Sequence, residues 1–216
     1  MGSVTLIIPT LNEGKNIGKL LDLVKDMQVI VCDDGSTDNT KEVVARYSFC
    51  TFLDRKDAKV HGLTASVVEG ITKATTPYVI VMDGDLQHPP ESLPSFVEKL
   101  KTADVVVGVR EMVASNWPWY RKLISWGATT LAKTMLRVRG TSVQDPMSGF
   151  FGVSRKLFLS TNQNKYVGQG YKVLLDLLKQ VRAHVTTVPY TFGARAEGMS
   201  KLRLAHWLWF LKSLIR

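Results

Sequence analysis

Short apolar runs rich in β-branched residues alternate with helical patterns through the first half of the chain. Such runs, bounded by turn residues, predict buried parallel strands over residues 4–9, 29–32, 78–82 and 105–109. Helical spacing of apolar residues falls between them, over residues 16–27, 37–47, 63–74 and 91–101. Ser36 and Thr37 are candidate caps for the second helix, and Pro90 suits the start of the fourth. This alternation predicts an α/β fold, with a mostly parallel central sheet and helices on both faces.

The second half of the chain is less regular. We expect loops over residues 111–120, 137–146 and 194–200, helices over 121–136 and 170–181, and strands over 149–153 and 185–192. Residues 202–215 have the pattern of a final apolar-rich helix. Because no internal repeat or linker interrupts the chain, we expect residues 1–200 to form one domain, followed by an amphipathic helix within residues 201–216.

The charge is divided unevenly along the 216 residues. Residues 1–98 carry 9 Lys and Arg against 14 Asp and Glu, a balance of −5, whereas residues 99–216 carry 19 against 5, a balance of +14. An acidic half joined to a basic half suggests cation chemistry in one and anion binding in the other. Nucleic acid, a phosphorylated substrate and an anionic membrane all fit the net charge of +9.

The composition excludes several classes of protein. A hydrophobic content of 45% argues against a disordered or fibrous chain. Two cysteines, Cys32 and Cys50, cannot form a disulfide framework, so a reducing compartment is the default. We find no signal-peptide pattern and no window near the ~18–20 apolar residues of a spanning helix. The chain as given is expected to be soluble or peripheral to a membrane.

Acidic residues follow three of the predicted strands. Asp83-Gly84-Asp85 comes directly after the third, and two carboxylates at this spacing can share a divalent cation, with Gln87 as a further oxygen ligand. Asp33 and Asp34 follow the second strand, and Glu13 follows the first. Each segment alone could be an ordinary turn with a helix cap. Together they point to one ligand crevice outside the carboxyl ends of the strands.

The motifs that carry this chemistry resemble those of the inverting family 2 glycosyltransferases of GT-A (Rossmann-like) fold. They are Pro9-Thr10-Leu11-Asn12-Glu13, Asp33-Asp34-Gly35-Ser36 with Asp38, Met82 to Pro89, and Asp145-Pro146 with Ser148-Gly149-Phe150. The likeness covers nearly the whole chain, with the motifs in the right order. Within the family it is strongest to the dolichol-phosphate (polyprenol-phosphate) mannose synthases.

The resemblance implies a nucleotide-sugar site. Its residues would be Pro9, Leu11 (where the family usually has Tyr), Glu13, Cys32, Asp34, Asp83, Gly84 (where the family usually has Ala), Asp85, Arg110, Arg195 and Lys201. Asp83, Asp85 and Gln87 would hold Mg²⁺ or Mn²⁺, and Asp85, Arg110 and Asp145 are the candidate catalytic residues. A metal and cationic clamps are also what a diphosphate leaving group requires.

Asp176 resembles an acidic position of the family, and an ordinary polar position on an amphipathic helix fits it equally well. His88, next to the metal motif, is a candidate to support a ligand.

The resemblance further implies a lipid monophosphate acceptor, dolichyl or polyprenyl phosphate. Such a phosphate is already ionised near pH 7, its second pKa being about 6, so no catalytic base is required. Its charge needs cations, and Arg110, Arg121 and Lys122 are the candidates. Trp126 stands where the family often has Arg.

Two aromatic-basic stretches, residues 117–120 and the tail 202–216, suit a membrane interface, although the tail could equally pack on the sheet. We expect peripheral attachment to the cytoplasmic face of a membrane, either endoplasmic reticulum or plasma membrane. A membrane-anchoring subunit or a missing transmembrane segment would complete it.

Three functions remain open on the sequence alone. The first is transfer of a hexose, mannose from GDP-mannose, onto a lipid phosphate. The second is a UDP-glucose or UDP-GlcNAc dependent transferase, with a lipid-phosphate or a hydroxyl acceptor; a hydroxyl acceptor would need Asp145 as general base. The third is a basic nucleic-acid-binding domain, which ranks last because neither an aromatic-lined groove nor a recognition helix is evident.

Overall fold

A seven-stranded sheet forms the centre of the molecule, with strand order β3-β2-β1-β4-β6-β5-β7. The computed structural model describes residues 2–113, 119–138, 140–166 and 172–193. The strands are β1 (Val4–Thr10), β2 (Gln28–Asp33), β3 (Cys50–Asp54), β4 (Tyr78–Val81), β5 (Val105–Val113), β6 (Phe151–Ser154) and β7 (Val185–Phe192). Every pairing is parallel except those of β6, which runs antiparallel to both β4 and β5. The expected α/β architecture with a mostly parallel sheet is confirmed.

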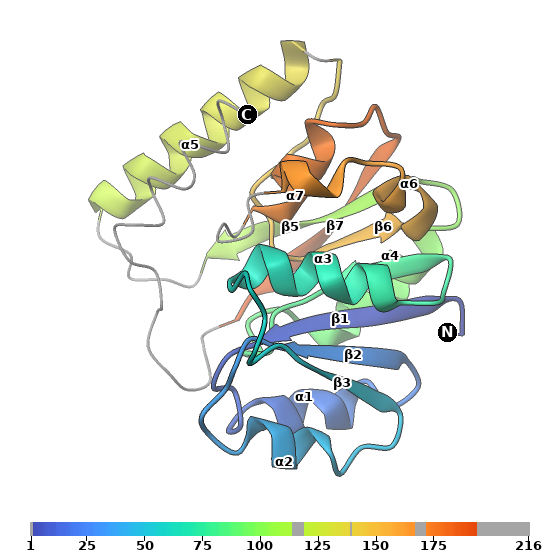
Figure 1. Ribbon diagram of the computed structural model, residues 1–216. Coiled ribbons are helices and arrows are strands. Elements are labelled where there is room, and N and C mark those ends of the chain that lie inside the picture. Colours follow the sequence, from blue (N-terminus) through green and yellow to red (C-terminus); the bar gives the residue numbers. More distant parts are fainter. Residues whose placement is uncertain (1, 114–118, 139, 167–171, 194–216) are drawn as a thin grey trace.

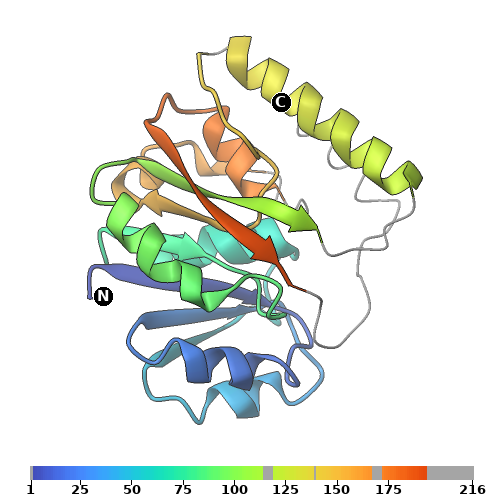
Figure 2. The same cartoon turned by 180° about the vertical axis from the view of Figure 1, so that it is seen from behind.

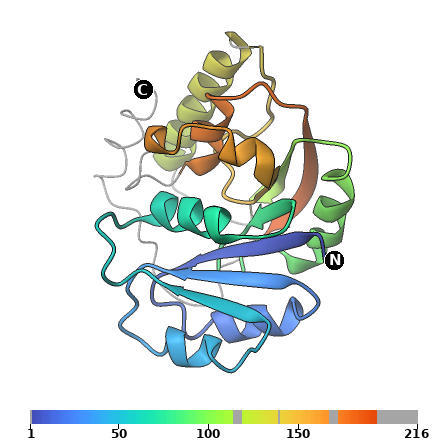
Figure 3. The same cartoon turned by 45° about the vertical axis from the view of Figure 1, so that its right-hand side comes forward.

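Helices cover both faces of this sheet (Figure 1). They are α1 (Ile17–Leu23), α2 (Thr40–Val44), α3 (Leu63–Lys73), α4 (Leu93–Lys99), α5 (Trp119–Val138), α6 (Arg155–Leu159) and α7 (Val173–Leu178), with short 3-10 turns at Pro90–Ser92 and Gln163–Lys165. Seen from behind, α1, α2 and α4 cover the face opposite α3, α6 and α7 (Figure 2). Figure 3 shows β1, β2 and β3 between α3 on one side and α1 and α2 on the other.

The alternation of side chains along each strand produces the two cores. In β1, Ile7 packs in the cluster under α3 and α7, whereas Leu6 and Ile8 pack in the cluster under α1 and α4. All three are completely buried. Successive residues of a strand point to opposite faces, so a nearly continuous apolar run is what a strand covered on both sides requires.

Four elements differ from the sequence-based expectation. β3 was not predicted, because it is an edge strand whose residues are only partly buried or exposed and include Thr and Asp. β5 continues to Val113, where a loop was expected. The short helix α6, which begins directly after β6, was not predicted. The antiparallel direction of β6 could not be predicted, because nothing in its short apolar sequence indicates which way the strand runs.

The expected cap of α2 was wrong. The N-cap residue is Asn39, and Asp38 rather than Ser36 or Thr37 accepts a hydrogen bond from the backbone N–H of Thr40, at 3.0 Å. Ser36 instead joins two loops: its Oγ donates to Asp33 Oδ2 and accepts from the N–H of Asn12. Pro90 does begin the short turn that leads into α4.

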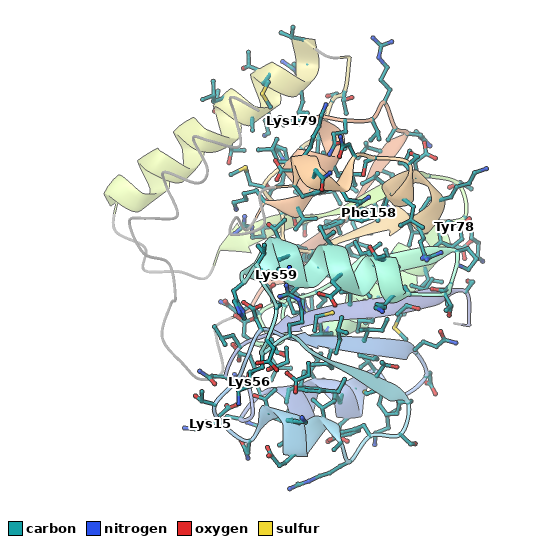
Figure 4. All side chains as sticks on the ribbon, in the orientation of Figure 1. Lys15, Lys56, Lys59, Tyr78, Phe158 and Lys179 are labelled. Carbon is teal, nitrogen blue, oxygen red and sulfur yellow. The ribbon has the colours of Figure 1, made fainter. Side chains whose placement is uncertain are left out.

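The carboxyl ends of β1, β2 and β4 emerge at the same edge of the sheet, because the three strands are parallel and adjacent. Figure 4 labels Lys15, Lys56 and Lys59 at this edge and Tyr78, the first residue of β4, at the opposite one. The loops with Glu13, Asp34 and Asp83 therefore emerge together, as ligand sites do in open α/β sheets. The proposed tail helix, residues 201–216, lies outside the described residues.

The packing of α3 on the sheet yields a stability prediction. A Cβ at Gly70 would lie 2.5 Å from Cys32 Sγ and 2.8 Å from Ile7 Cγ2, both in buried side chains. We expect Gly70→Ala to lower the free energy of unfolding by about 1–3 kcal/mol, because the helix must move outward. Urea denaturation measures the change.

The matched control is Gly127→Ala in α5, where nothing lies within 4 Å of the added Cβ. There the substitution should raise helix stability by about 0.5–1 kcal/mol. Equal effects of the two substitutions would show that α3 does not pack closely on the sheet.

Candidate active site

The loop that follows β4 carries the two carboxylates expected to hold a metal. Asp85 is 4% exposed, and its Oδ1 accepts a hydrogen bond of 3.1 Å from the backbone N–H of Gln87. The Asp83 side chain is more open, at 37% exposure. Between Asp85 and Gln87 the chain passes through a left-handed conformation at Leu86, with φ of 64°. Such backbone strain in a non-glycine residue is typical of functional loops.

The buried side chain of His88 holds this loop through a hydrogen bond to its backbone. It is buried and stacks on Phe150, with ring centroids 5.0 Å apart. Its Nδ1 accepts a hydrogen bond of 3.2 Å from the backbone N–H of Asp83. Burial lowers the pKa of His88 to about 4. The imidazole is therefore neutral at physiological pH and acts as an acceptor, consistent with the expected supporting role.

Gly84 lies between the two carboxylates, and its Cα faces the protein interior. A Cβ at this position would meet the side chains of Ile8, Thr10 and Ile17 at 3.4–3.7 Å, which is ordinary contact with the protein interior. At Gly149, in the loop before β6, a Cβ would lie 3.5 Å from Asp83 Oδ2, which is also ordinary van der Waals contact. The loop before β6 therefore packs directly against the carboxylate loop after β4.

Arg110 and Asp145 form an ion pair at this junction. The Arg110 guanidinium donates to Asp145 Oδ2 at 3.2 Å, with 27% and 15% of the two side chains exposed. Asp145 Oδ1 accepts from the backbone N–H of Met147. Asp145 thus orients Arg110, which lies near the end of β5, and shapes its own loop. The sequence predicted both residues but not their contact.

Lys172 is a further cation at the junction that sequence reasoning missed. Its Nζ donates to the Met147 carbonyl at 3.1 Å. Burial lowers the pKa of Lys172 to about 8, partly opposed by the nearby carboxylates of Asp145 and Asp83. The only sequence signal was a lysine in the first turn of the helix predicted over residues 170–181. Asp176, one turn further along, in α7, is 4% exposed and lies within electrostatic reach of Tyr166.

The loop after β2 carries Asp34, whose carboxylate is held by contacts with Arg55 and Gly62. Arg55, which follows β3, donates to Asp34 Oδ1, and the backbone N–H of Gly62 donates to Oδ2 at 2.7 Å. Asp33 is structural, since it accepts hydrogen bonds from Thr10 and Ser36. Arg55 was missed because the strand that places it was missed.

The first segment, at the end of β1, approaches the loop after β2. Pro9 pairs with Cys32 in the register of the sheet, and Leu11 is 38% exposed. Glu13 Oε2 accepts from the Asn16 side chain at 3.1 Å, and the Glu13 backbone N–H donates to Thr40. Leu11 is thus the apolar surface that this segment offers a ligand.

The Cys32 side chain is excluded from such a role. It is completely buried against α3, and burial raises the pKa of its thiol to about 12. Cys32 is therefore part of the hydrophobic core, and its thiol is not exposed to a ligand.

The donor set fits a hard divalent cation that completes its shell from a ligand. Asp83 and Asp85 supply two carboxylates, and within the described ranges no group of three or more His, Cys, Asp or Glu surrounds a metal site. Mg²⁺ is commonly held by one or two carboxylates together with substrate phosphates and water. Gln87 lies beside them, and its Nε2 donates to the Gly193 carbonyl at 3.3 Å.

Several expected site residues fall elsewhere. Arg195 and Lys201 lie outside the described residues, although Gly193, just before them, bonds to Gln87 through its backbone N–H. Arg121 and Lys122 belong to the first turn of α5, but their side chains lie outside what the structure describes. The site therefore consists of the ends of β1, β2, β4 and β5 and the loop before β6.

Solved structures of similar fold are glycosyltransferases. Glucosyl-3-phosphoglycerate synthase from Mycobacterium tuberculosis with uridine diphosphate has a TM-score of 0.72 and 19% identity, over 98% of this chain and 77% of that one. The same enzyme with Mn²⁺ and UDP-glucose has a TM-score of 0.71 and 19% identity, over 99% and 76%. The fold is thus that of a GT-A glycosyltransferase.

Sequence comparison narrows the class to one family. The model for glycosyl transferase family 2 matches residues 5–160. Dolichol-phosphate mannosyltransferases from Pyrococcus furiosus and Saccharomyces cerevisiae are 35% and 33% identical, over 93% and 92% of this chain. A third, from Mycosarcoma maydis, is 35% identical over 93%. The chain belongs to glycosyl transferase family 2. It spans 59% of the Pyrococcus protein, 80% of the Saccharomyces protein and 74% of the Mycosarcoma protein.

The Arg110–Asp145 pair can be tested by a thermodynamic cycle. Because the pair is largely buried, we expect Arg110→Ala and Asp145→Ala to be non-additive in the free energy of unfolding, with a coupling of about 0.5–3 kcal/mol. The exposed Lys101–Glu98 pair is the control, with a coupling of at most about 0.5 kcal/mol. Additivity of the first pair would mean that Asp145 does not hold Arg110.

Proposed function

We propose that this chain transfers a hexose, mannose from GDP-mannose, onto dolichyl or polyprenyl monophosphate. The observation that carries the proposal is that Asp83 and the Arg110–Asp145 pair all lie within electrostatic reach of the buried Lys172. The chain's relatives in three organisms are named dolichol-phosphate mannosyltransferase. Paired carboxylates beside a held guanidinium suit a diphosphate leaving group and a phosphate nucleophile.

Asp83, Asp85 and Gln87 would hold Mg²⁺ or Mn²⁺. When bound there, the ion supplies positive charge to the diphosphate, which becomes more negative as the glycosidic bond breaks. The chain's own part is to fix the carboxylates: the His88 ring holds the Asp83 backbone, and the Gln87 N–H holds Asp85. Leu11, Glu13 and Asp34 would bind the nucleoside, and Arg195 and Lys201 would clamp the diphosphate.

Arg110 would bind phosphate, with Arg121 and Lys122 as further acceptor contacts. Both oxygens of Asp145 already accept hydrogen bonds, from Arg110 and from Met147 N–H, which suits orienting a cation better than removing a proton. An acceptor that arrives ionised needs no such base. This favours the lipid phosphate over a hydroxyl acceptor.

The proposal places the reaction at a membrane. We propose a catalytic domain over residues 1–200 and an interfacial helix over residues 201–216, attached to the cytoplasmic face of the endoplasmic reticulum or plasma membrane, alone or through an anchoring subunit. Within the part of the chain that is described, no helix has the length and apolar character to cross a bilayer. Nucleic acid has no place in this reaction.

A panel of donors and acceptors tests the reaction. Radiolabelled GDP-mannose, UDP-glucose and UDP-GlcNAc are each offered with dolichyl phosphate, undecaprenyl phosphate and dolichol, the unphosphorylated alcohol. We expect organic-extractable product from GDP-mannose with the two phosphates and none with dolichol. Transfer to dolichol or to a water-soluble hydroxyl would contradict the proposal.

The metal assignment is tested by Asp85→Ala. We expect turnover to fall by about 100-fold or more, because charge on the leaving group loses its main stabilisation. The exposed Glu98→Gln on α4 is the control and should keep full turnover and the same Mn²⁺ titration. An Asp85→Ala protein with unchanged turnover and Mn²⁺ dependence would show that the metal lies elsewhere.

A further inference from the structure

Arg55 is a buried cation that the proposed reaction does not use. It is 4% exposed and follows directly after β3. Its guanidinium donates to four groups: Asp34 Oδ1, Glu69 Oε2 at 2.9 Å, Ser66 Oγ at 2.7 Å and the Val60 carbonyl at 2.7 Å. A buried charge is tolerated only when paired and hydrogen-bonded in this way. The planar fork of arginine can make all these bonds at once, whereas lysine cannot.

The contacts of Arg55 immobilise one particular carboxylate. Asp34 lies on the loop after β2, while Ser66 and Glu69 lie on α3, so the guanidinium ties the loop to the helix. The Asp34 side chain is 11% exposed, in contrast to 41% for Glu69. Asp34 thus remains accessible at the ligand edge of the sheet but has little freedom to rotate.

The remaining hydrogen-bonding capacity of Asp34 can be counted. Oδ1 contacts the Arg55 guanidinium and His61 Nδ1, and Oδ2 accepts from the backbone N–H of Gly62. A carboxylate offers about four acceptor positions, two on each oxygen. Among the described residues, one position on Oδ2 is therefore left for a ligand donor.

We propose that Arg55 is the positioning residue of the nucleobase subsite, holding Asp34 so that Oδ2 accepts one ring N–H of the base. This inference rests on the proposed function and deepens it. Guanine and uracil carry a ring N–H on their hydrogen-bonding edge, whereas adenine and cytosine carry an unprotonated ring nitrogen there. The subsite therefore selects guanosine or uridine diphosphate over adenosine or cytidine diphosphate.

The test is calorimetric binding of GDP, UDP, ADP and CDP, each with Mn²⁺, to the full chain and its variants. The wild type should bind GDP or UDP tighter than ADP and CDP. Arg55→Lys and Asp34→Asn should each weaken the preferred nucleotide by about 10- to 100-fold, the worth of a charged hydrogen bond. Binding of ADP and CDP should change less than threefold. The double variant should be no weaker than Asp34→Asn, because Arg55 acts through Asp34.

Controls separate this role from a general loss of structure. Lys41→Ala removes an exposed ion pair with Asp54, one residue before Arg55, and should leave all four affinities unchanged. Where Arg55→Lys does not fold, Glu69→Gln loosens the guanidinium from α3 without touching Asp34, and should reduce selectivity partially.

Two results would overturn the inference: losses that add in the double variant, or an Arg55→Lys protein that loses ADP and CDP affinity as much as GDP or UDP affinity. Wild-type protein that binds none of the four would overturn both the subsite and the proposed donor. Selective binding without transfer to lipid phosphate would overturn only the acceptor half of the proposed function.

Discussion

The parallel pairing of β1 with β2 and with β4 is the constraint on which the site depends. Its register places Thr10 opposite Asp33 and Ile7 opposite Val81, so three loops leave the sheet side by side. Hydrogen bonds between the loops then fix them, from Thr10 Oγ1 to Asp33 and from Asn12 N–H to Ser36. Without this register, acidic residues at separate strand ends would not meet.

A cluster of carboxylates at one edge repels itself unless each has a partner. Asp34 is held by Arg55 and Asp145 by Arg110, so these two are neutralised within the protein. Asp83 and Asp85 are the pair for which a metal with its diphosphate is the proposed partner. The division of the chain into an acidic and a basic half thus corresponds to one proposed reaction, in which carboxylates hold the cation and the nucleoside while Arg and Lys hold phosphates.

The sequence predicted the sheet well where burial on both faces leaves a continuous apolar run, as in β1 and β4. It failed at β3, whose edge position leaves it half polar, and at the direction of β6, which depends on its partners alone. The residues of the candidate site divide in the same way, into those that the sequence indicated and those that it did not. Asp83, Asp85 and Asp34 could be recognised because each follows a strong strand, whereas Arg55 and Lys172 act through distant partners that spacing cannot reveal.

The central claim is that a metal and a diphosphate bind together where β1, β2, β4 and β5 end. Paramagnetic broadening of backbone amide resonances by Mn²⁺ in the presence of a nucleoside diphosphate locates the ion directly. The account predicts that the amides of Gly84, Gly149 and Gly193 broaden first, while those of Thr76 and Ser154, at the opposite end of β4, stay sharp. Broadening at Thr76 and Ser154 first, or equally along the chain, would contradict it.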